Sequence, residues 1–210
     1  MEDKRFNCGV VLFRAQPIHN THIKLIKEAL DENKRVYIVI GSSDKFKTKR
    51  NPLTYKQRRK YIALALDELV NSDIKYDKAM NKIGLFGLFD YTSEDDTDNI
   101  VNWGRYLYYN LVGHTGEHNF NLYYCDKPEI IEPWFESEVK EHINLRLYDR
   151  ETWGNGVSAT NIRNALLDLD NGDNLVYLRN NLPKLVFMHI DEISKILKPI
   201  YMEDRTDGKG

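Results

Sequence analysis

Two histidines, an arginine and a proline stand close together near the start of the chain, in the stretch FRAQPIHNTHIKLI at residues 13–26. Their spacing is Arg14-x-x-Pro17-x-His19-x-x-His22. Imidazoles can donate hydrogen bonds to phosphate oxygens, and the guanidinium adds a fixed positive charge. Held together, these groups could stabilise the negative charge that develops during phosphoryl or nucleotidyl transfer.

The same residues stand where a strand should end and a helix begin. Residues 7–13 are an apolar run typical of a buried strand, and apolar residues then recur at helical spacing, at Ile23, Ile26, Ala29 and Leu30. Ligands of open parallel sheets bind beyond the carboxyl ends of the strands, and a helix N-terminus attracts phosphate. Two surface histidines flanking a turn, or a zinc site, are the other interpretations. The whole pattern favours a phosphate site, since no further zinc-ligand pattern accompanies it.

This stretch resembles the HxGH signature of the nucleotidyltransferase superfamily, which usually reads G-R-F-x-P-x-H-x-G-H. The matching residues are Arg14, Pro17, His19 and His22. Phe13 stands where the signature has a glycine before the arginine, and Thr21 replaces the glycine of HxGH. Thr21 could equally cap the helix. The resemblance implies that ATP is bound by Phe13, Arg14, His19 and His22.

A second stretch, residues 40–62, is similar to the IGSAQ…NPFTAGER segment of archaeal-type nicotinamide mononucleotide (NMN) adenylyltransferases. The matching residues are Gly41, Ser42, Asn51, Pro52, Thr54 and Arg58. Thr54 is a good helix cap, and Arg58 lies one turn into the helix. The resemblance implies that Arg58 contacts the phosphate of NMN and that Ser42 and Asn51 also bind NMN. The alternative for Arg58 is a solvated charge on the helix.

Two later stretches complete the resemblance. In GVSATNIRNAL, residues 156–166, the signature S-x-T-x-x-R is matched by Ser158, Thr160 and Arg163. Ser158 can cap a second helix whose N-terminus faces the same phosphates, and the resemblance assigns all three residues to ATP. Trp103 matches a tryptophan that stacks on the nicotinamide ring in the resembled family, as suits a cationic ring. A core tryptophan in an amphipathic helix is the alternative.

The order of elements predicts how these stretches are positioned. Apolar and β-branched runs predict strands at 7–13, 35–43, 83–89, 120–125 and 143–149. Helical spacing and caps predict helices after residue 19, at 54–70, from 98 or 99 to 111, at 127–139, from 160 onward and at 183–197. This alternation predicts an α/β fold: a Rossmann-like doubly wound parallel sheet with C-terminal helices. We expect a nucleotidyltransferase domain at residues 1–182, on which a C-terminal helix and frayed tail, 183–210, pack.

The amino-acid composition and the net charge indicate which classes of protein the chain can belong to. The chain has 210 residues, of which 41% are hydrophobic and 30% charged, with a net charge of −2. This balance is typical of a globular protein, and it provides no general attraction to nucleic acid or an anionic membrane. Cys8 and Cys125 are too few for a disulfide scaffold, so we expect reduced thiols. No apolar run suits a signal peptide or a membrane span, so we expect a cytoplasmic protein.

The resemblance implies a reaction in which ATP and NMN give NAD and pyrophosphate. The catalytic residues would be Arg14, His19, His22 and Arg163, which would hold the triphosphate and the leaving pyrophosphate, while Arg58 holds the attacking phosphate. Mg²⁺ would be carried by the ATP phosphates, with no metal ligand assigned in the protein. The acceptor could instead be nicotinate mononucleotide, phosphopantetheine or flavin mononucleotide, or the protein could be a non-catalytic nucleotide-binding sensor. Relatives often form homo-oligomers, and Tyr106, Tyr108 and Tyr109 could serve an interface or the core.

Overall fold

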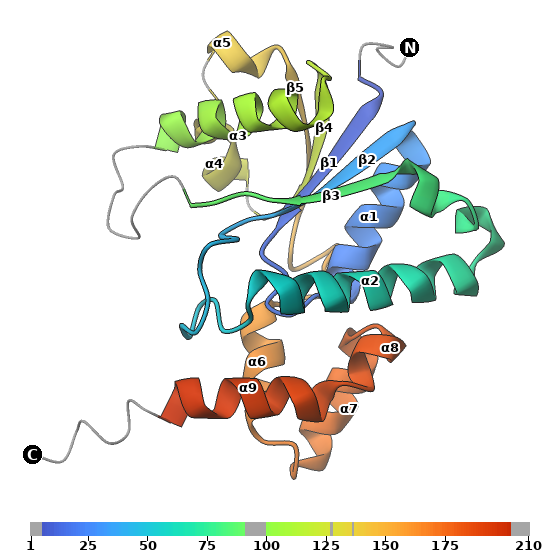
Figure 1. The fold of residues 1–210 in the computed structure, drawn as a ribbon, viewed down its shortest axis with the longest axis vertical. Coiled ribbons are helices and arrows are strands. Elements are labelled where there is room, and N and C mark those ends of the chain that lie inside the picture. Colours follow the sequence, from blue (N-terminus) through green and yellow to red (C-terminus); the bar gives the residue numbers. More distant parts are fainter. Residues whose placement is uncertain (1–5, 91–99, 127, 136, 203–210) are drawn as a thin grey trace, which may run out of the picture. The chain divides into compact units, whose positions relative to one another are not determined.

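Five parallel strands form one sheet in the order β3-β2-β1-β4-β5 (Figure 1). The computed structural model of the chain describes residues 6–90, 100–126, 128–135 and 137–202. The strands are β1 (Cys8–Phe13), β2 (Arg35–Ile40), β3 (Ile83–Gly87), β4 (Phe120–Cys125) and β5 (Ile143–Tyr148). All five predicted strands are therefore present, and the predicted α/β fold with a parallel sheet is confirmed.

The register brings the carboxyl ends of the strands to one edge of the sheet. The pairing of β1 with β2 runs from Cys8 beside Arg35 to Phe13 beside Ile40. On the other side of β2, Ile40 lies beside Gly87 at the end of β3. The segments that follow β1, β2 and β3 therefore all begin at the same edge, as the sequence predicts for parallel strands.

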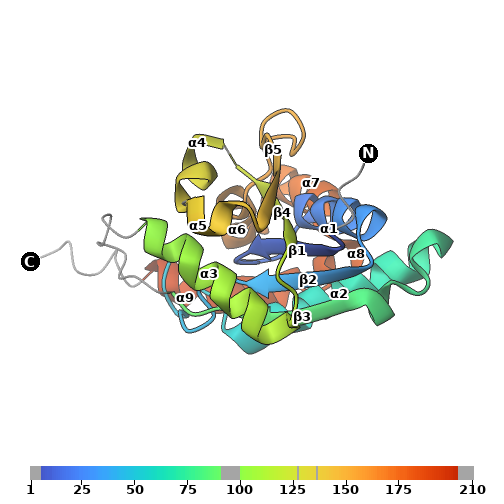
Figure 2. The same ribbon diagram turned by 90° about the horizontal axis from the view of Figure 1, so that it is seen from above.

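Helices cover both faces of the sheet (Figure 2). The side chains of Cys8, Val10 and Leu12 belong to a buried core that they share with Leu107 and Leu111 of α3 (Ile100–Thr115). The residues between them point the other way, because side chains alternate along a strand. A Cβ on Gly9 would lie 3.4 Å from the Cβ of Ala29 in α1 (Asn20–Glu32). Since α1 and α3 lie on opposite faces, the sheet is doubly wound.

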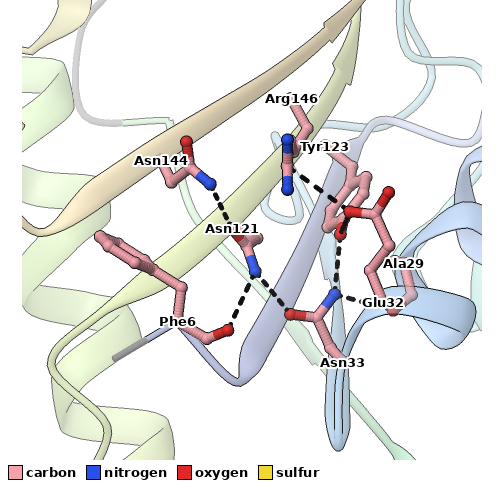
Figure 3. A network of polar contacts seen from close by, with 8 residues as sticks. All are labelled: Phe6, Ala29, Glu32, Asn33, Asn121, Tyr123, Asn144 and Arg146. Carbon is pink, nitrogen blue, oxygen red and sulfur yellow. Dashed lines mark hydrogen bonds and ion pairs between the residues drawn. The ribbon is translucent and has the colours of Figure 1, made fainter. Parts of the chain in front are cut away.

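A largely buried polar network links the end of α1 to β4 and β5 (Figure 3). Asn121 Nδ2 donates to Asn33 Oδ1 at 2.8 Å, and Asn144 Nδ2 donates to Asn121 Oδ1 at 2.6 Å. Asn33 Nδ2 donates to the hydroxyl of Tyr123 at 2.8 Å, and that hydroxyl donates to Glu32 Oε2 at 2.6 Å. Burial, and then the hydrogen bond to Glu32, raise the pKa of Tyr123, so the hydroxyl stays protonated and can donate.

Glycine at position 9 leaves the space that this network needs. A Cβ at Gly9 would lie 2.8 Å from Asn33 Nδ2 and 3.1 Å from Asn33 Cγ. Both distances are shorter than a normal van der Waals contact, so a larger residue in β1 would displace the amide group of Asn33. The close approach of strand and helix therefore depends on the missing side chain.

We expect Tyr123→Phe to lower the free energy of unfolding by about 1–3 kcal/mol, because the hydrogen bond from the hydroxyl to the charged Glu32 carboxylate is lost while the ring still fills its site. Tyr123 is 0% exposed. Urea denaturation would measure the change. Tyr37→Phe on β2 is the matched control, because the Tyr37 hydroxyl makes no hydrogen bond with the residues that the structure describes. Equal losses in the two variants would contradict a specific contribution from the network.

The chain forms two compact units, and each is assembled from three separate stretches. The unit that contains the sheet consists of Met1–Phe13, Lys24–Ser42 and Asn81–Gly156, and the second unit consists of Arg14–Ile23, Ser43–Met80 and Val157–Gly210. The helices of the second unit are α2 (Tyr55–Ser72), η1 (Ile74–Tyr76), α6 (Ala159–Leu167), α7 (Gly172–Asn181), α8 (Lys184–Phe187) and α9 (Ile190–Met202). In this unit α6 contacts α7 and α9, while α8 contacts α2 and α7. The division at residue 182 remains a prediction.

Two predicted helices are wrong in their continuity. The single helix expected at 183–197 is two helices, α8 and α9, and the acidic residues Asp191 and Glu192 stand in the first turn of α9, where the helix dipole favours them. Over the described residues of the range 127–139, the single expected helix is three pieces, α4 (Pro128–Ile131), η4 (Glu132–Trp134) and α5 (Ser137–Lys140). Pro133 stands in η4 and has no backbone N–H to donate, so a regular α-helix is not continued through it, and Phe135 after η4 is extended.

Smaller differences concern the ends of elements. The strand expected at 35–43 ends at Ile40, and α3 extends to Thr115. The start expected for α3 at residue 98 or 99 lies outside the described residues. A short 3-10 helix, η2 (Ala79–Lys82), precedes β3. Both cysteines are free thiols, as expected, and burial raises the pKa of Cys8 to about 12.

No helix in the part of the chain that the structure describes has both the length and the apolar character needed to span a membrane.

Candidate functional site

The segment that joins β1 to α1 belongs to the second unit and carries the predicted phosphate-binding histidines. Ala15 has a φ of 53°, in the left-handed region that few non-glycine residues adopt, and the Gln16–Pro17 peptide bond is cis. The carbonyl of His19 accepts hydrogen bonds from the N–H groups of His22, at 2.9 Å, and Ile23, at 3.3 Å. His19 therefore lies just before the helix and His22 in its first turn, as predicted.

The two imidazole rings are stacked. Their centroids are 3.8 Å apart with an angle of 28° between the planes. The backbone N–H of His19 donates to His22 Nδ1 at 3.2 Å. Because Nδ1 of His22 accepts this bond, the neutral imidazole carries its proton on Nε2. Nε2 of His22 is therefore a hydrogen-bond donor, and a phosphate oxygen could accept from it.

Arg58 ties the beginning of α2 to the histidine segment. Thr54 caps α2 with a reciprocal capping box in which Gln57 takes part. One turn later, Arg58 is 0% exposed. Its Nη1 donates to the carbonyl of Arg14 at 3.2 Å, and its Nη2 donates to the carbonyl of Lys45 at 3.4 Å. Arg58 is therefore not a solvated helix charge.

Arg163 makes the corresponding link from α6. Ser158 is the N-cap of this helix, as predicted, and its Oγ accepts from the N–H of Asn161. Arg163 is 7% exposed. Its Nη1 donates to the carbonyl of Gln16 at 3.0 Å, and its Nη2 donates to Thr160 Oγ1 at 3.1 Å. The late S-x-T-x-x-R signature and the early histidine signature therefore meet in one unit.

Gln16 is a site residue that the sequence prediction missed. Its side chain is 1% exposed and pairs twice with Leu53: Oε1 accepts from the backbone N–H at 2.9 Å, and Nε2 donates to the backbone carbonyl at 3.2 Å. The same residue accepts from Arg163 through its own carbonyl. Gln16 therefore joins all three stretches of the second unit. Sequence offers only a weak signal for it, namely an amide side chain at a variable position of the signature.

Asn51 is buried without partners for its side chain. It is 1% exposed, and neither Nδ2 nor Oδ1 has a hydrogen bond with any of the described residues. Its backbone is satisfied, since the N–H donates to Thr48 Oγ1 at 2.9 Å. A buried polar group without a partner costs about 1–3 kcal/mol. Such a group in a native structure needs an explanation, and a bound ligand is one.

Three predicted site residues belong to the unit that contains the sheet. Phe13 is the buried last residue of β1. Ser42 is also buried, has a φ of 50°, and donates through Oγ to Asp90 Oδ1 at 2.7 Å. Trp103 lies against the core of that unit, with ring centroids 5.9 Å from Trp134 and 5.6 Å from Tyr106. These contacts favour the interpretation of Trp103 as a core residue of an amphipathic helix. Its stacking on nicotinamide remains a prediction.

Left-handed backbone conformations occur in the segments that follow three of the strands. Ala15 follows β1, Ser42 and Lys47 follow β2, and Asn155 follows β5. Each such residue costs of order 1 kcal/mol, and such residues cluster at ligand sites. Their positions agree with the segments that the sequence assigns to ligand binding.

The chain is similar to known nucleotidyltransferases in sequence and in fold. Residues 14–165 match the family described as "Cytidylyltransferase-like". A protein of Picrophilus torridus named nicotinamide-nucleotide adenylyltransferase is 27% identical over 188 residues, which are 89% of this chain and 91% of that protein.

Two solved structures of a bifunctional NMN adenylyltransferase/ADP ribose pyrophosphatase from Francisella tularensis share the fold. The first has a TM-score of 0.69 at 16% identity, and the second, complexed with AMP and a manganese ion, has a TM-score of 0.64 at 17% identity. Both alignments cover 96% of this chain, and they cover 54% and 55% of the Francisella chains. This chain thus spans about half the length of those proteins.

Proposed function

This chain belongs to the cytidylyltransferase-like family, and from that premise we propose that it is an NMN adenylyltransferase that makes NAD and pyrophosphate from ATP and NMN. The name of the Picrophilus relative, which aligns over nearly its whole length, supports the choice of substrates. The observation that carries the proposal is that Arg58 and Arg163 both donate to the backbone of the segment Arg14–Gln16. Guanidinium groups from two distant stretches are thus held at the segment that leads to the two histidines.

The reaction that we propose is a single in-line displacement. An oxygen of the NMN phosphate attacks the α-phosphorus of ATP and forms a new P–O bond. The bond between that phosphorus and the oxygen that bridges to the β-phosphate breaks, and pyrophosphate leaves with the bonding electrons. No protein nucleophile is required, so the protein contributes positioning and charge stabilisation.

The contacts of several residues support the roles that we propose. His22 donates through Nε2 to a phosphate oxygen, and Arg163 offers its remaining N–H groups to the triphosphate. Arg14 and His19 lie on the same short segment and complete the anion site. Ser158 and Thr160 act through their hydroxyls, which cap α6 and orient Arg163. Arg58 donates to the carbonyls of Arg14 and Lys45, and its positive charge would attract the attacking phosphate.

A divalent cation would be carried by the ATP phosphates, where it neutralises charge. Mg²⁺ usually keeps several waters and binds few protein ligands when a nucleotide is present. The Francisella structure with AMP and a manganese ion supports a divalent cation in this fold. In the described residues, no group of three or more His, Cys, Asp and Glu side chains could hold a metal ion.

The test is NAD formation from ATP, Mg²⁺ and NMN, followed by chromatography of the nucleotides, with release of pyrophosphate measured in the same sample. The proposal predicts equal amounts of NAD and pyrophosphate. Nicotinate mononucleotide, phosphopantetheine and flavin mononucleotide serve as competing acceptors. Transfer to one of these without transfer to NMN would contradict the proposed substrate, and ATP binding without any transfer would contradict the proposed activity.

We expect Asn51→Leu to raise the unfolding temperature of the free protein and to raise the KM for NMN about tenfold or more. Leucine has a similar volume but no buried polar atoms, so the unpartnered amide of the free protein disappears together with its contact to NMN. Thermal unfolding and steady-state kinetics measure the two changes. A lower unfolding temperature with unchanged KM would show that Asn51 has only a structural role.

A further inference from the structure

The hydroxyl of Tyr201, in α9, joins two of the stretches that the proposed function needs. It accepts a hydrogen bond from Arg163 Nε at 3.0 Å and donates one to the carbonyl of Lys49 at 2.8 Å. A phenol hydroxyl has one donor and two acceptor positions, so a single oxygen can serve both partners. The amine of Lys49 also lies 6.0 Å from the centroid of the Tyr201 ring.

The contact with Tyr201 completes the anchoring of Arg163. Three N–H groups of the guanidinium are held by three separate acceptors, on Tyr201, Gln16 and Thr160. Arginine has five N–H groups in a rigid plane, so three bonds in different directions fix both the position and the rotation of that plane. Within the described residues, one N–H on each terminal nitrogen is then left for a ligand.

We propose that Tyr201 is a positioning residue of adenylyl transfer, which acts on the phosphates through Arg163 and on the loop that contains Lys49. This inference rests on the proposed function. Tyr201 lies beyond residues 14–165, which match the family, so the C-terminal helix α9 adds to this chain a part of the site that the family signatures do not contain. Removal of the hydroxyl leaves Arg163 with two anchors, so that the plane of its guanidinium is held less firmly.

The competing explanation is that Tyr201 only helps to pack α9 against α6, which are in contact. Tyr201→Phe distinguishes the two, because phenylalanine keeps the ring and loses the oxygen. We expect kcat to fall about tenfold, since small losses of orientation have large effects on rate, while the unfolding temperature falls only slightly, as for the loss of a partly exposed hydrogen bond. Tyr177→Phe is the matched control, because Tyr177 is a half-buried tyrosine of α7 in the same unit.

A double-mutant cycle with Arg163→Met measures whether the effect of Tyr201→Phe on kcat depends on Arg163. A role of Tyr201 in packing alone would give no such dependence. If Tyr201 acts through Arg163, Tyr201→Phe lowers kcat in the wild type and has little further effect once Arg163 is methionine. An equal effect of Tyr201→Phe in both backgrounds, or no effect beyond that of Tyr177→Phe, would overturn the inference.

The same cycle also separates this inference from the proposed function. If the wild type makes no NAD, the proposed function fails, and the cycle is then read on the affinity for ATP with Mg²⁺ by calorimetry. A loss of ATP affinity in Tyr201→Phe that disappears in the Arg163→Met background supports Tyr201 as a positioning residue for nucleotide phosphates. Additive losses, or none, would refute it.

Discussion

Replacement of His22 by alanine is expected to lower kcat for NAD formation by about 10²–10³-fold, the usual effect of removing one donor that stabilises charge in a transition state. The hydrogen bond from His19 to Nδ1 leaves Nε2 of His22 as the donor. Steady-state kinetics with saturating ATP and NMN measure the loss. His118→Ala is the control, because His118 is an exposed histidine in the unit that contains the sheet.

His22→Asn separates the two roles of the imidazole. An asparagine oxygen can still accept from the His19 N–H at the start of α1, but it places no donor where Nε2 lies. We expect His22→Asn to unfold at the wild-type temperature and to be as slow as His22→Ala. If His22→Asn were nearly as fast as the wild type, the histidine would matter for the start of the helix and not for the phosphates.

Replacement of Arg163 by methionine is expected to lower kcat/KM by a similar factor, about 10²–10³. Methionine keeps much of the side-chain length, but it removes the charge and leaves the carbonyl of Gln16 without its donor. The free energy of unfolding should fall as well, by about 1–3 kcal/mol. Kinetics at a temperature well below the unfolding transition separate the two effects.

Arg163→Lys tests whether charge alone is sufficient. Lysine supplies a positive charge but has no planar fork, so it cannot serve Tyr201, Gln16 and Thr160 as arginine does. We expect its activity to lie closer to that of Arg163→Met than to that of the wild type. Arg179→Met, at an exposed arginine on α7, should leave kcat/KM unchanged. Full activity of Arg163→Lys would argue against the three-point anchoring.

Local signals made much of the site predictable from the sequence. Thr54 and Ser158 cap helices because their side chains reach backbone N–H groups only three residues away, which depends on nearby residues alone. The alternation of apolar strands and amphipathic helices likewise made the parallel sheet predictable. His19 and His22 could be placed at the start of α1 for the same reason.

Contacts between residues that are far apart in the sequence could not be predicted from it. Gln16 pairs with Leu53 across 37 positions, and Tyr201 pairs with Arg163 across 38. Neither residue differs in type from an ordinary surface residue, so only the fold reveals that Gln16 is buried. Apolar periodicity continued through Met188 as well, and the break between α8 and α9 depends on packing that periodicity does not record.

The two units are interleaved along the chain, so the proposed anion site depends on stretches that are far apart in the sequence. The path crosses between the units after Phe13, Ile23, Ser42, Met80 and Gly156, so no single cut releases either unit intact. The three stretches with the proposed phosphate-binding groups are separated by 19 or more residues of the other unit, and a cut near residue 156 leaves neither fragment with all three of them. A protease nick near residue 156 should therefore abolish nucleotide binding in both fragments, and mixing the separated fragments should restore it only if they reassociate.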